Sequence, residues 1–208
     1  MTLRFFPALL LGAAVAAFAL LGIAMAVNHF IAEPYNPGFA RHPLLVQGHA
    51  ALGGVYLALG AFQFVPAIRR RAIGAHRWNG RFLAAIALFV GASAIFIGAV
   101  IPFSGPPETV VISIFGAVYL YAIVAGVAAA RDGRIDRHRA WMIRAYAVGS
   151  AVVTMRLIFI PSLMFLAPVS DLGASELSII AFSLAFIIHT LTAELWLRHT
   201  ARAGAPDA

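Results

Sequence analysis

Long apolar runs separated by short polar segments fill almost the whole chain. Each run approaches or exceeds the roughly 20 residues that an α-helix needs to cross the hydrocarbon core of a bilayer. No glycine/serine linker or internal repeat separates them, so residues 1–208 are expected to form a single transmembrane domain. The pattern predicts an all-α bundle of six transmembrane helices, at 5–27, 43–66, 82–102, 109–130, 140–167 and 176–197.

Arginines gather in two of the polar segments, and basic residues in short loops stay on the cytoplasmic side. The other loops carry mostly acidic residues, among them Glu33 and Asp171. Six crossings with both clusters inside place the N- and C-termini in the cytoplasm. The two clusters are Arg69, Arg70, Arg71, Arg77 and Arg81, and Arg131, Arg134, Arg137, Arg139 and Arg144.

Composition narrows the function classes. The chain is 62% hydrophobic and 11% charged, which leaves almost nothing for an extramembrane domain. The chain has a net charge of +7, and the arginines that produce it lie where the predicted helices meet the membrane surface. The expected partner is therefore anionic lipid headgroups and not nucleic acid. The absence of cysteine excludes disulfides, iron–sulfur clusters and thiolate metal sites. All 15 basic residues are arginines, which with the many alanines is typical of the codon bias of a bacterial genome. The expected location of this multi-pass protein is therefore the bacterial cytoplasmic (inner) membrane.

The first apolar run has two interpretations. Arg4, the run itself and the small residues around Met25 imitate a secretory signal with its cleavage site. The run is longer than a usual signal core, so we expect a retained membrane anchor. Cleavage would leave five helices and an N-terminus outside the cytoplasm.

Polar side chains within the runs are candidate functional residues, because ionisable groups are costly in a membrane. A rise of about 1.5 Å per residue sorts them by depth. In 43–66, one face carries small and polar residues, with Gly53 and Gly60 placed to let another backbone approach. The inner tier holds Gln63, Arg144 and Glu194, bordered by His76 and His138; the outer tier holds His49 and Arg156; His189 lies between them.

Two explanations of the buried charges stay open. In the first, an Arg144–Glu194 ion pair supports an inner polar pocket, and Arg156 offers a cationic site for an anionic ligand. In the second, Glu194 pairs with Arg198 at the favourable i,i+4 spacing, while Arg156 bonds backbone carbonyls or extends toward the surface.

Histidines raise the hypothesis of a b-type haem, which needs two imidazoles at one height on different helices. His76 and His138 qualify, and the arginines that follow them, Arg77 and Arg139, are suited to the haem propionates. The alternative is ordinary interface anchoring by Arg and Trp residues. His49 has only loop histidines at its height, so a second haem is less favoured.

The chain carries several distinctive motifs: His49 with Gly54, 60–63, 76–81, 138–147, 153–157 and 193–194. Together they resemble a family of bacterial polytopic membrane proteins, the domain of unknown function DUF2306. The resemblance implies no activity, but it implies that seven residues are signature positions: His49, Gln63, His76, His138, Arg144, Arg156 and Glu194. Asn79 departs from the family, which more often has an apolar residue there.

The leading functional hypothesis is a bundle that holds a cofactor or lipophilic ligand, in its most concrete form electron transfer between haem b and quinone. The alternatives are a transporter for a small anion, centred on Arg156, and a structural or assembly subunit of a membrane complex. Enzymatic action on a lipid, with His76 and His138 as acid and base, also stays open. The sequence does not indicate an oligomeric state.

Overall fold

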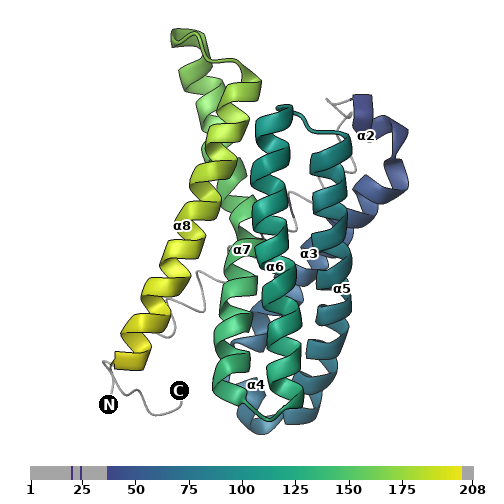
Figure 1. Cartoon of the computed structure of the whole chain (residues 1–208), viewed down its shortest axis with the longest axis vertical. Helices are drawn as coiled ribbons and strands as arrows, with labels where there is room; N and C mark the ends of the chain where they lie inside the picture. The colour runs from purple at the N-terminus through teal and green to yellow at the C-terminus, as the bar shows by residue number, and fades with distance from the viewer. Residues whose placement is uncertain (1–19, 21–23, 25–36, 203–208) are drawn as a thin grey trace.

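The computed structural model describes Leu20, Ala24 and residues 37–202 (Figure 1). This part of the chain is helical throughout, without a strand, as the apolar pattern predicts. The elements are α2 (Pro37–Arg41), α3 (Pro43–Gln63), α4 (Pro66–Arg71), α5 (Ile73–Val100), α6 (Pro106–Arg131), α7 (Ile135–Pro161), the π-helical η1 (Ser162–Leu166), the 3-10 turn η2 (Ala167–Val169) and α8 (Ala174–Arg202).

Five helical segments are long and apolar enough to cross a membrane: α3, α5, α6, the run from α7 through η2, and α8. They confirm five of the six predicted spans. The remaining predicted span, 5–27, lies outside the described residues apart from Leu20 and Ala24, so the count of six and the orientation of the termini stay predictions.

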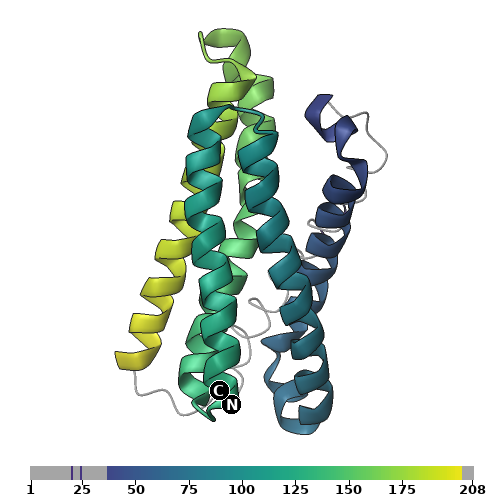
Figure 2. The ribbon, with the colours of Figure 1, turned by 45° about the vertical axis from the view of Figure 1, so that its right-hand side comes forward.

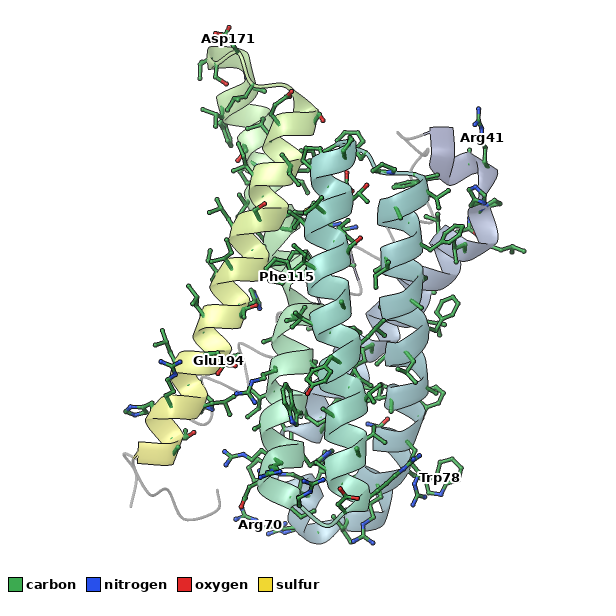
Figure 3. All side chains as sticks on the ribbon, viewed as in Figure 1. Arg41, Arg70, Trp78, Phe115, Asp171 and Glu194 are labelled. Carbon is green, nitrogen blue, oxygen red and sulfur yellow. The ribbon has the colours of Figure 1, made fainter. Side chains whose placement is uncertain are left out.

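Both arginine clusters lie at one end of the bundle, where Figure 3 labels Arg70, while Arg41 and Asp171 lie at the opposite end. We call these the arginine-rich end and the distal end. The arginine-rich end contains the last turn of α3, the first turns of α5 and α7, and the last turns of α6 and α8.

Four helices form a ring. α3 packs on α5, α5 on α6, α6 on α7, and α7 returns to contact α3. As a result, α5 and α7 sit at opposite corners of the ring. α8 lies outside it, packed mainly along α7 (Figure 2).

Two helices begin earlier in the sequence than the apolar runs from which they were predicted. α5 begins at Ile73 and not at 82, and α7 begins at Ile135 and not at 140. Hydropathy detects only the apolar part of a helix, whereas backbone hydrogen bonding continues into polar turns near the membrane surface. At its far end, regular α7 geometry stops at Pro161, which lacks an amide hydrogen, and the chain continues as the π-helical η1.

Three tyrosines fill the centre of the ring. The ring centroid of Tyr56 on α3 lies 5.8 Å from that of Tyr119 on α6 and 6.0 Å from that of Tyr146 on α7. The Tyr146 hydroxyl donates a 2.9 Å hydrogen bond to the Leu57 carbonyl. Gly60 makes room for this arrangement, since a Cβ there would lie 2.8 Å from Tyr146 Cε2.

The role predicted for the glycines of α3 therefore needs correction. Gly60 admits an aromatic ring of α7 and not a neighbouring backbone, and a Cβ on Gly53 would meet no atom of the described residues within 4 Å. Spacing along one helix shows where a small residue lies, but the partner helix decides what fills the space.

Candidate functional site

His76 and His138 occupy equivalent positions in two helices. Each is the fourth residue of its helix, α5 or α7, at the arginine-rich end. Their amides close the first α-helical turns, His76 N–H donating to the Ala72 carbonyl at 3.0 Å and His138 N–H to the Arg134 carbonyl at 2.9 Å. α5 and α7 are opposite corners of the ring, and the two histidines are close enough to interact electrostatically.

The His138 imidazole is oriented by α6. Its Nδ1 lies 2.9 Å from the carbonyl oxygen of Gly126, which can only accept, so Nδ1 carries the hydrogen. The Nε2 atom then holds the lone pair. This is the arrangement in which histidine commonly binds a metal, with the second ring nitrogen fixed by a backbone carbonyl.

The His76 imidazole is half-buried, and its Nδ1 is buried without a hydrogen-bond partner among the described residues. His138, Arg69 and Arg77 all lie within range of electrostatic interaction with it. A polar ring atom in this position calls for a partner. The surroundings are cationic, which favours a ligand bearing acidic groups.

The residues that follow the two histidines differ in exposure. Trp78 is exposed and points away from the bundle, as an interface anchor does (Figure 3). Trp141 packs edge-on to Tyr121, with ring centroids 5.2 Å apart. The Arg144 guanidinium lies over the Trp141 ring, with Cζ 4.8 Å from the ring centroid. The anchoring interpretation therefore suits Trp78, while Trp141 is part of the helix packing.

Gln63 lies against α5. A Cβ on Gly80 would lie 3.6 Å from Gln63 Oε1. Close by, Asn79 donates a 3.2 Å hydrogen bond to the Leu59 carbonyl, so this residue, at which the chain departs from the resembled family, joins α5 to α3.

Arg144 and Glu194 form the ion pair that one of the two sequence interpretations predicts. Arg144 Nε donates to Glu194 Oε1 at 2.5 Å, and a terminal nitrogen donates to Oε2 at 3.0 Å. This two-point contact joins α7 to α8. The alternative partner Arg198 has no ion pair with Glu194 within the described ranges.

His189 lies higher on α8 and faces two hydroxyls of α7. Its Nε2 is 2.8 Å from Thr154 Oγ1, and its Nδ1 is 3.5 Å from Ser150 Oγ. Sequence reasoning singled out His189 but missed both partners. Their four-residue spacing, which puts both hydroxyls on one face of a helix, is the signal that could have revealed them.

The two residues of the predicted outer tier contact different helices. His49 Nδ1 lies 2.9 Å from the oxygen of the buried Ser93 on α5. Arg156 donates a 3.3 Å hydrogen bond to the Val152 carbonyl of its own helix, as the alternative interpretation expects. His29, one of the loop histidines predicted at the height of His49, lies outside the described residues.

Metal binding by side chains alone has no candidate in the described residues, because no three His, Asp or Glu side chains gather there. A haem requires only two protein ligands, since the porphyrin supplies four. His76 and His138 are thus the pair to consider for an iron-containing cofactor.

Comparison with known proteins supports the membrane assignment. The sequence model of one family, DUF2306, described as a predicted membrane protein, matches residues 46–197. No curated protein and no solved structure matches the chain. The matched segment contains all five of the membrane-spanning helices of the structure, apart from the ends of α3 and α8.

Proposed function

The chain belongs to the DUF2306 family of predicted membrane proteins, and we propose that it is a membrane cytochrome in which His76 and His138 bind one b-type haem. The observation that carries the proposal is the equivalent placement of the two histidines on opposite corners of a helical ring. Two imidazoles on different helices at one end of the bundle could together hold the iron of one haem.

Hydrogen bonding around the pair supports this assignment. The Gly126 carbonyl fixes the His138 ring with Nε2 as the lone-pair atom, and the buried Nδ1 of His76 calls for a partner. Arg69 and Arg77 near His76, together with Arg139 beside His138, suit two propionate groups, because guanidinium binds carboxylate through paired hydrogen bonds.

A bound haem would supply one-electron chemistry. The chain itself would hold the ring by two imidazoles, orient it by arginine contacts, and shield it with the apolar bundle. Because the protein lies in a membrane, a lipophilic quinone is the natural class of redox partner. The bacterial inner membrane is the proposed location.

The test is a visible absorption spectrum of protein purified in detergent after expression with sufficient haem. We expect a Soret band and, after dithionite reduction, a sharp α-band. Both features should disappear in His76→Ala and in His138→Ala, and remain in His199→Ala, which removes an exposed histidine of α8.

A colourless wild-type protein, or a spectrum that both site variants retain, would overturn the haem assignment. Circular dichroism and gel filtration of each variant establish that the bundle has folded. If the haem assignment is overturned, the two histidines become interface residues or residues that contact lipid, and acid–base action on a lipid is one such role.

Transport of a small anion is the second candidate, and it depends on Arg156. The hydrogen bond from Arg156 to its own helix is the local arrangement that a structural role requires, so it does not favour transport. A role as an assembly subunit predicts instead a stoichiometric protein partner that survives mild detergent.

A further inference from the structure

A line of proton-carrying side chains runs along the α7–α8 interface, separate from the two-histidine site. We propose that Glu194, Thr190 and His189 form a proton relay that leads from the arginine-rich end into the bundle. The inference does not depend on haem binding, because it rests on other residues and on a different pair of helices.

His189 can hold a proton in this interface without losing its partners. The Ser150 hydroxyl donates to the Tyr146 carbonyl at 2.7 Å, so its oxygen is left to accept from Nδ1–H of His189. The Ala147 carbonyl, which can only accept, also bonds this imidazole. Nδ1 therefore carries the hydrogen in the neutral ring.

The Thr154 hydroxyl can form a hydrogen bond with the other ring nitrogen, Nε2, whether His189 is neutral or charged. With His189 neutral, the Thr154 hydroxyl donates to Nε2 across 2.8 Å. After Nε2 gains a proton, rotation of the hydroxyl turns the same oxygen into an acceptor. Only one hydrogen moves, so the imidazole can take up and release a proton without repacking α7 against α8.

Glu194 marks the beginning of the relay. The carboxylate lies one turn and a residue beyond His189 on α8, about 7.5 Å farther along the helix axis. About a third of its side chain, 33%, is exposed on the protein surface near the arginine-rich end. Arg144 holds this carboxylate in place through two hydrogen bonds.

Thr190 lies between these two groups, next to His189 and one turn from Glu194. Its hydroxyl oxygen is buried and has no hydrogen-bond partner among the residues that the structure describes. A buried hydroxyl requires a partner, and water bonded to Thr190 would extend the path from the carboxylate toward the imidazole. Chains of acidic and histidine side chains in membrane helices are typical of proton pathways.

Hydrogen exchange at the imidazole tests the relay directly. Protein labelled with nitrogen-15 in histidine is reconstituted in phosphatidylcholine and phosphatidylglycerol bilayers and transferred to heavy water. Solid-state NMR then follows the loss of each imidazole N–H signal, and His189→Gln identifies the signal of His189.

We expect the His189 N–H signal to disappear measurably sooner in the wild type than in Thr190→Val or Glu194→Gln. Thr192→Val, a matched change on the exposed face of α8, should leave the rate unchanged. Thr190→Val keeps the Arg144–Glu194 ion pair, so it separates relay loss from helix disruption. Exchange at the wild-type rate in Thr190→Val, or none in the wild type, would overturn the proposal.

Discussion

Arg144 of α7 and Glu194 of α8 form two hydrogen bonds, of 2.5 and 3.0 Å, across fifty residues of sequence. α8 lies outside the four-helix ring and packs mainly on α7, so this ion pair sets the register of the outermost described helix. It also places a carboxylate beside the interface that contains His189.

Loss of either charge is expected to destabilise the bundle. Arg144→Gln or Glu194→Gln should lower the free energy of unfolding by about 1–2 kcal/mol, since the remaining partner keeps a charge without its counter-ion. Unfolding in mixed detergent micelles, followed by circular dichroism, measures the effect. The double variant should recover part of the loss, whereas strictly additive losses would show that the two residues do not act together.

Gly60 and Gly53 offer a matched pair of substitutions on α3. Gly60→Ala should destabilise the protein by about 1–3 kcal/mol, because the new Cβ would lie 2.8 Å from a Tyr146 ring that a hydrogen bond to Leu57 holds in place. Gly53→Ala meets no neighbour in the part of the chain that the structure describes and should be neutral or slightly stabilising, because alanine favours helix. Thermal unfolding in detergent compares the two; equal effects would contradict the packing described.

Membrane orientation can be measured without background labelling, because the chain contains no cysteine. Arg70→Cys lies at the arginine-rich end and Asp171→Cys at the distal end (Figure 3). In intact cells, we expect a membrane-impermeant maleimide to label Asp171→Cys, while Arg70→Cys should react only after permeabilisation. The reverse pattern would invert the predicted topology.

Arg156 separates transport from a structural role. Arg156→Gln should fold, keep any haem spectrum and lose the hydrogen bond from Arg156 to the Val152 carbonyl, with an unfolding free energy lowered by about 1 kcal/mol. Flux of small anions in proteoliposomes is the decisive measurement. A variant that folds but no longer moves an anion carried by the wild type would favour the transporter interpretation over the cytochrome.

Several features followed from the sequence alone. Apolar runs predicted the helical class and five spans that the structure contains, and charge placement predicted that both arginine clusters share one end. Counting residues from Arg139 and Arg198 put Arg144 and Glu194 at one depth, which made their ion pair one of two interpretations, and the structure contains this pair. These predictions succeed because hydropathy and helical rise both measure position along the membrane normal.

Tertiary structure alone decided which helices face each other. Gln63 shares the depth of Arg144, yet it lies against Gly80 of α5, and His189 meets Thr154 and Ser150. α5 and α7 occupy opposite corners of the ring, which places His76 and His138 on helices that are not neighbours in the ring. Rise along a helix determines depth, but the direction in which a side chain meets a neighbour depends on how the helices pack, and packing is a property of the whole bundle.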